Sequence, residues 1–162
     1  MLVGLLGAAA WAEYRPAFVQ GENLLFRIRW GTITGGYSTL TVPDIETKDG
    51  STAYHIVSEA RSTGFIDTFY KVRDKNEAWM DTALPRSLGY AKKLREGKYR
   101  VEESVRFDQA ANRFHLEEHR LDRNTRETKE GDIPPNVFDI LSSFYYVRGV
   151  PRSGDHGVHR CA

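Results

Sequence analysis

Residues 87–108 read SLGYAKKLREGKYRVEESVRFD, and this stretch decides the fold class. Apolar and polar side chains alternate on both sides of Gly97, a residue that readily takes the positive φ of a tight turn. Alternation with a period of two is typical of a half-buried strand. The stretch therefore predicts a β-hairpin with one largely apolar face and one charged face.

The same alternation predicts strands on either side of this hairpin. They are expected at residues 24–30, 37–42, 53–61 and 75–81, and near 113–121. Pro43 and Asp44 are expected to end the second of these strands, and the polar segment 122–132 is expected to be a loop. The predicted fold is mainly β, a curved antiparallel sheet of half-barrel or sandwich-like form.

Two short helices are predicted from apolar side chains spaced four residues apart. One covers residues 64–70, with Thr63 as its N-cap and with aromatic side chains that would be buried. The other covers residues 136–147, with Asn136 as its N-cap. Both are expected to pack on the concave side of the sheet.

Composition and short motifs exclude several classes of function. The 162 residues carry 23 basic and 22 acidic side chains, a net charge of +1, so no strong field favours nucleic acid. We find no glycine-rich phosphate loop, no Gly-x-Ser-x-Gly motif and no Cys-x-x-Cys motif. His156, His159 and Cys161 are too weak a set to predict a metal site. We therefore predict no cofactor and no metal, and assign no catalytic residue.

The first twelve residues differ from the rest of the chain. They carry no charge, and Ala10-Trp11-Ala12 has the small-x-small form that signal peptidase prefers. The run is too short to span a bilayer, which needs about 20 apolar residues. We interpret residues 1–12 as the remnant of a signal peptide cleaved before Glu13, and expect a periplasmic or secreted protein.

The predicted hairpin also carries a polar interruption of its apolar face. If the turn is centred on Glu96 and Gly97, Lys92 lies diagonal to Glu103 across the two strands. The pair is then either a polar contact inside a ligand-holding face or a partly exposed ion pair of little consequence.

Several sequence segments together resemble the bacterial envelope family catalogued as domain of unknown function 3108. They are Gly21-Glu22, residues 28–31, 54–57, 60–67, 69–74 and 93–99, Ile133-Pro134-Pro135, residues 139–142 and Tyr145-Tyr146. The resemblance implies an exported, largely β protein and no particular reaction. We assign residues 13–149 to a partial domain of this family. Residues 150–162 are expected to be a disordered tail outside it, because the resemblance stops early, as in a C-terminal truncation.

These observations favour a binding or carrier module for a lipid, another apolar small molecule or an envelope partner. The candidate ligand-binding residues are Trp30, Tyr70, Trp79, Tyr90, Lys92, Tyr99 and Glu103, with Phe107 as a further lining residue. One alternative is an envelope hydrolase that uses Asp67, Asp74, His55 or Glu77. Another is a structural protein that pairs through an open sheet edge. The oligomeric state is left unassigned.

Overall fold

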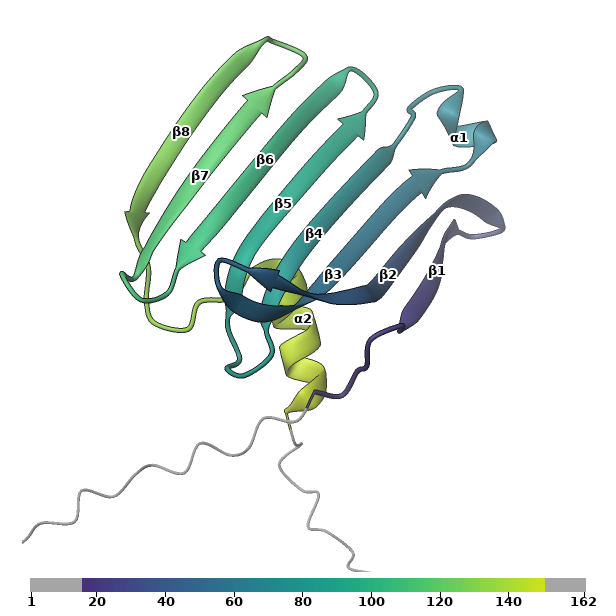
Figure 1. Cartoon of the computed structure of the whole chain (residues 1–162). Helices are drawn as coiled ribbons and strands as arrows, with labels where there is room; N and C mark the ends of the chain where they lie inside the picture. Colours follow the sequence, from purple (N-terminus) through teal and green to yellow (C-terminus); the bar gives the residue numbers. More distant parts are fainter. Residues whose placement is uncertain (1–15, 151–162) are drawn as a thin grey trace, which may run out of the picture.

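Eight antiparallel strands form a meander, with each strand hydrogen-bonded to its neighbours in sequence (Figure 1). The computed structural model describes residues 16–150. The elements are β1 (Asn23–Trp30), β2 (Ile33–Lys48), β3 (Ser51–Ser62), α1 (Gly64–Asp67), β4 (Arg73–Asp81), β5 (Ser87–Glu96), β6 (Tyr99–Asp108), β7 (Arg113–Arg120), β8 (Thr125–Asp132) and α2 (Ile140–Gly149). The sheet does not close, so β1 and β8 are its edges. The predicted fold class is confirmed.

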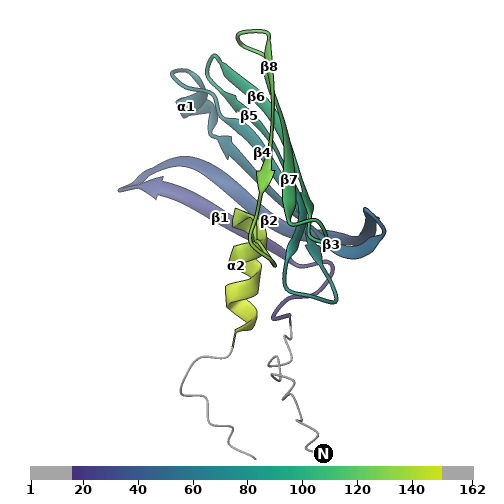
Figure 2. The ribbon, with the colours of Figure 1, turned by 90° about the vertical axis from the view of Figure 1, so that its left-hand side faces the viewer.

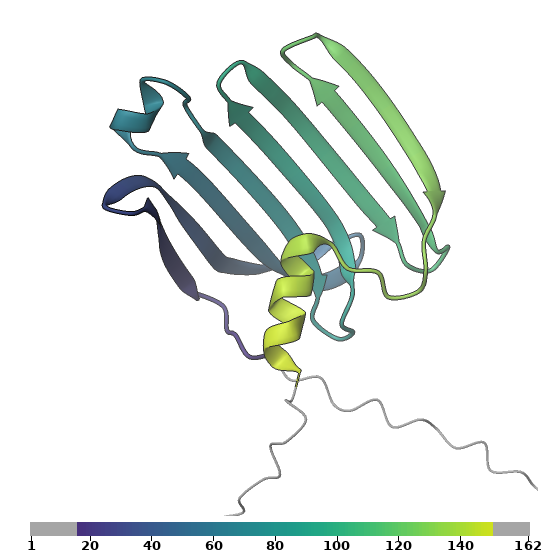
Figure 3. The same ribbon diagram turned by 180° about the vertical axis from the view of Figure 1, so that it is seen from behind.

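The sheet is strongly twisted, and its two sides differ. Figure 2 shows β1 and β2 turning out of the plane of the other strands, toward the side on which α2 lies. Seen from behind, α2 lies over one end of that side, where it contacts β3 and β4 (Figure 3). We call this side the α2 face and the other side the opposite face. The helix α1 lies at the far end of the sheet beside β2, so only α2 covers a face as predicted.

The hydrophobic core lies between α2 and the part of the α2 face that this helix covers. Its buried members are Phe18, Leu40, Val42, Ile56, Ala78, Met80 and Tyr145. The strand residues among them recur at every second position, which places them on one side of the sheet. The ring of Phe18 lies 4.6 Å from that of Tyr145 and 4.9 Å from that of Tyr54, so the segment before β1 closes the core.

Helix α2 begins at Ile140, four residues after the predicted start at 136, and its N-cap lies three residues after the predicted one. Its N-cap is Asp139, whose carboxylate accepts hydrogen bonds from the backbone amides of Leu141 and Ser142. Asn136, the predicted cap, instead has a positive φ of 59° and lies in the connection before the helix. A carboxylate at this position also suits the positive end of the helix dipole, which the neutral Asn136 would do less well.

Two strand predictions were wrong. β2 continues past Pro43 to Lys48, because a shift of register between Thr41 and Asp44 lets pairing with β3 resume. The expected loop at 122–132 contains the edge strand β8, which pairs with β7 along its whole length. Its side chains are almost all exposed, so it has no apolar alternation from which a strand could be predicted.

The hairpin of β5 and β6 forms as predicted, but its turn lies one residue further along the chain. Gly97 takes a φ of 56°, and Glu96 pairs with Tyr99. As a result Lys92 lies directly opposite Glu103, and not diagonal to it. The shift between predicted and observed pairs is two residues, so every side chain keeps its predicted face.

Helix α1 is shorter than predicted and does not bury its aromatic side chains. It covers Gly64–Asp67, and Phe65 and Phe69 remain 64% and 77% exposed. Thr63 occupies the N-cap position without capping by its side chain; its hydroxyl donates instead to the backbone oxygen of Thr34, 3.1 Å away.

Candidate functional site

Three of the predicted site residues meet on the α2 face. The Lys92 Nζ lies 3.0 Å from Glu103 Oε2, and the hydroxyl of Tyr90 donates to Asn76 Oδ1 at 2.8 Å. The Lys92 and Glu103 side chains are 27% and 13% exposed, so the ion pair is largely shielded. Burial, with the negative charges of Asp139 and Glu103 nearby, raises the pKa of Tyr90 to about 12, so its hydroxyl stays protonated. This arrangement joins β4, β5 and β6 above the core.

Tyr99 and Phe107 belong to the same face but to its margins. The guanidinium of Arg120 lies over the Tyr99 ring, 4.4 Å from its centre, and so covers that ring. Phe107 pairs with Phe114 at the other end of β6. Neither residue contacts the Lys92–Glu103 pair through a bond or ring contact within residues 16–150.

The side chain of Trp79 lies on the opposite face, away from that of Tyr90, although both residues line one small pocket of about 250 Å³. Its ring stacks on His55 with centroids 5.2 Å apart, and its indole N–H donates to Glu46. The Lys48 ammonium lies 4.3 Å from the centre of the ring. The end of the β2–β3 hairpin thus packs over Trp79, which gives this aromatic side chain a structural role.

Two of the four residues considered for a hydrolase come together beside Trp79. The His55 Nε2 lies 3.1 Å from Glu77 Oε1, and Lys75 Nζ lies 2.9 Å from the same oxygen. Burial alone would raise the pKa of Glu77, but hydrogen bonds from Lys75 and His55 hold it below its usual range. In the described part of the chain no hydroxyl or thiol bonds to the His55 imidazole, so these residues do not form a nucleophile–base pair.

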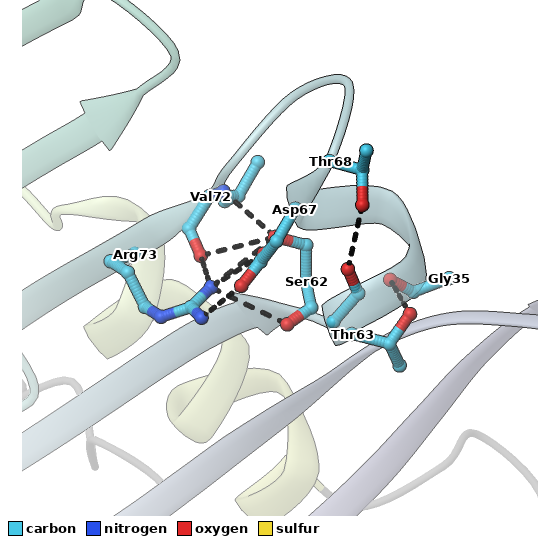
Figure 4. A network of polar contacts seen from close by, with 8 residues as sticks. Gly35, Ser62, Thr63, Asp67, Thr68, Val72 and Arg73 are labelled. Carbon is cyan, nitrogen blue, oxygen red and sulfur yellow. Dashed lines mark hydrogen bonds and ion pairs between the residues drawn. The ribbon is translucent and has the colours of Figure 1, made fainter.

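Asp67, the third hydrolase candidate, anchors α1 to the sheet (Figure 4). Its carboxylate makes a two-point ion pair with the Arg73 guanidinium, at 2.5 and 3.1 Å, and accepts a hydrogen bond from Ser62. These hydrogen bonds, first that from Arg73, lower the pKa of Asp67. Asp74, the fourth, accepts a hydrogen bond from the backbone amide of Arg95. Burial, and after it the charge of Asp74, raises the pKa of Glu96.

Exposed apolar side chains gather at the end of the sheet where α1 lies. The hydroxyl and amide of Thr63 bond to the start of β2, which brings α1 beside the β1–β2 turn (Figure 1). We call the following set the tip surface: Ile28, Trp30, Ile33, Phe65 and Phe69. Trp30 is 90% exposed, and Tyr70 next to this surface is 49% exposed. Trp30 thus lies at the tip, away from Lys92 and Glu103, whereas the hydroxyl of Tyr70 donates to Glu96 at the end of β5.

A second feature, missed by the sequence reasoning, is a groove on the opposite face. Its volume is about 470 Å³. It is lined by Leu25, Tyr37, Thr39, Glu59, Ala60, Arg61, Arg73, Asp74, Lys75, Lys93 and Arg95. The signal in the sequence is weak, because the charged residues of the groove are divided among β3, β4 and β5, which are separate segments of the chain.

Comparisons with known proteins identify the family. The model of a family described as "Protein of unknown function (DUF3108)" matches residues 25–160. The chain belongs to this family. The match includes residues beyond Gly149, where we placed the end of the resemblance. No curated protein and no solved structure matches this DUF3108 chain.

The described residues offer neither a metal site nor a membrane-spanning helix. Among residues 16–150, no group of three or more His, Cys, Asp or Glu side chains is placed to hold a metal ion. Neither helix of that region has the length and apolar character needed to cross a bilayer. The predicted signal peptide, at residues 1–12, and the set His156, His159 and Cys161 lie outside the described residues.

Proposed function

We propose that this DUF3108 protein is an exported, periplasmic binding module that engages an apolar or acylated ligand through the tip surface. The observation that carries the proposal is the exposure of large apolar side chains at one end of the sheet, above all the 90% exposed Trp30. Soluble proteins rarely expose contiguous apolar patches unless the patch serves an interaction.

The tip surface is supported from beneath by polar contacts. The ion pair between Asp67 and Arg73 and the bonds of Thr63 to the start of β2 fix α1 against the sheet. The rings of Phe65 and Phe69 lie 5.8 Å apart in an edge-to-face arrangement. Apolar groups held in place in this way lose less conformational entropy when a ligand covers them, which favours binding.

Export is supported by the N-terminal pattern, in which the uncharged run ends in Ala10-Trp11-Ala12. Secretion of the chain with a mature N-terminus at Glu13, measured by mass spectrometry of a periplasmic extract, is the expected result. A protein retained in the cytoplasm with residues 1–12 still attached would contradict this part of the proposal.

Binding is tested with palmitic acid as the probe, by native mass spectrometry and by tryptophan fluorescence. Trp30→Ala should weaken binding by roughly 10- to 100-fold, because a buried indole contributes up to about 3 kcal/mol to an apolar contact. It should change the free energy of unfolding by less than about 0.5 kcal/mol, because Trp30 is exposed. Leu84→Ala, at an exposed apolar residue between β4 and β5, is the matched control and should bind as the wild type does. Equal affinities for the wild type and Trp30→Ala would refute the proposal.

A further inference from the structure

The groove on the opposite face concentrates positive charge at one place of the sheet. Arg61 on β3 pairs directly with Arg73 on β4. On the next row, Glu59 pairs with Lys75, and Lys75 pairs with Lys93 on β5. Arg95 lies two residues after Lys93 on the same face of β5, at the level of Arg61 and Arg73. Side chains that lie directly opposite one another are about 4.5–5.5 Å apart at Cβ, so five cations share this part of the face with the carboxylate of Glu59. Asp74 also lines the groove, and Glu102 on β6 lies directly opposite Lys93.

Only two of these five cations are neutralised by the protein. Asp67 pairs with Arg73, and Glu77 pairs with Lys75. Within residues 16–150, the side chains of Arg61, Lys93 and Arg95 pair with no acidic group. Like charges on neighbouring strands destabilise a sheet. An anion in the groove would remove this repulsion.

The clustering is not a consequence of overall composition. The whole chain has a net charge of only +1, from 23 basic and 22 acidic residues. A volume of about 470 Å³ falls within the range of small-molecule sites. Tyr37 and Thr39 of β2 line the same groove and add hydroxyl groups that can bond to a polar ligand.

From these observations we propose that the groove is a binding site for a phosphate-bearing anion. Arginine presents a planar fork of donors that matches phosphate oxygens, and lysine adds a point charge. Arg61, Arg95 and Lys93 supply the free donors, while Arg73 is held in place by Asp67 and Lys75 by Glu77. The site rests on charged residues and not on the tip surface, so it goes beyond the proposed function.

The groove also lies close to the tip surface. Arg61 precedes Gly64, the first residue of α1, by three positions, which corresponds to about 10 Å of extended chain. A phosphate in the groove and an acyl chain at the tip are therefore within reach of one amphiphile. The two sources of phosphate, a soluble compound and a lipid head group, are separated by the experiment below.

The test is titration calorimetry of the full chain with inorganic pyrophosphate at low ionic strength. Arg61→Gln/Lys93→Gln removes two free cations of the groove and should weaken binding at least about tenfold. The control Arg106→Gln/Lys98→Gln removes the same charge from exposed positions outside the groove and should change binding by less than about twofold. Trp30→Ala should bind pyrophosphate as the wild type does, which separates this site from the proposed apolar ligand.

No binding of pyrophosphate by the wild type would overturn the inference, as would an equal loss in both double variants, because either result means that the groove is not a site. Competition then identifies the source of phosphate. If phosphatidylglycerol vesicles displace pyrophosphate and glycerol 3-phosphate does not, the ligand is a lipid head group. If glycerol 3-phosphate displaces it and vesicles do not, the ligand is a soluble phosphate compound.

Discussion

Replacement of Asp139 by Ala is expected to release α2 from the sheet. The Asp139 carboxylate accepts hydrogen bonds from the hydroxyls of Ser87, at 2.5 Å, and Ser142, at 2.6 Å. It also accepts from the amides of Leu141 and Ser142, and its own backbone amide donates to the Ser87 hydroxyl. All three polar residues are buried, so water does not replace these bonds readily.

The size of the effect follows from these contacts. Loss of an N-cap side chain costs about 0.5–2 kcal/mol. Each hydroxyl bonded to the carboxylate contributes roughly 1.5–3 kcal/mol, part of which is recovered when the site relaxes. We expect Asp139→Ala to lower the free energy of unfolding by about 3–5 kcal/mol, a large part of the roughly 5–15 kcal/mol typical of a whole domain. Asp139→Asn keeps an acceptor for the cap and should cost less, about 1–2 kcal/mol.

Urea unfolding followed by circular dichroism measures these changes, together with the variant Ser87→Ala and the double variant Ser87→Ala/Asp139→Ala. Because the two residues bond to each other, the double variant should lose less than the sum of the single losses, by about 1–2 kcal/mol. A cost below about 1 kcal/mol for Asp139→Ala, or additive effects in the double variant, would show that the buried network does not hold α2.

Two further predictions concern the sheet itself. Gly36→Ala should destabilise the protein by roughly 1–3 kcal/mol in urea unfolding, because a Cβ there would lie 2.6 Å from the backbone oxygen of Arg61. Gly35→Ala meets its nearest atom at 3.9 Å and is the matched control, so equal losses would contradict this reasoning. Glu96→Gln should stabilise the protein at pH 7, since burial and the charge of Asp74 raise the pKa of Glu96 above its usual 4.5 and make the ionised form unfavourable in the folded state. The gain should disappear below about pH 4, where Glu96 is protonated in both states, and a gain that is the same at both pH values would exclude this cause.

The strands with one buried side could be predicted from the sequence. In the β5–β6 hairpin, the alternation of Val101, Val105 and their neighbours gave the faces correctly, because a half-buried strand must place every second residue toward the core. The turn position was off by one residue, since Gly97 is compatible with more than one turn register. β8 could not be predicted, because it lies at the edge and its stability comes from backbone pairing with β7.

The arrangement of the candidate sites could be predicted only in part. Lys92 and Glu103 were correctly placed on one face, because both lie on the strands of a single hairpin. The face on which Trp79 lies was not resolved, since its contacts with Lys48 and Glu46 depend on how far β2 continues beyond Pro43. The cations of the groove come from three strands, β3, β4 and β5, and the register between these strands is not encoded in any one segment.

The meander order has a consequence for how the chain folds. Each strand pairs with the strand next to it in sequence, so the sheet can grow hairpin by hairpin. The ion pair between Glu22 and Arg148 is different, because 126 positions separate its partners, and the contact of Phe18 with Tyr145 spans a similar distance. Among residues 16–150, such contacts close the longest loops and carry the largest entropic cost of loop closure. The segment before β1 is therefore expected to dock last, after α2 has settled on a preformed sheet, and to be the first part to detach when the protein unfolds.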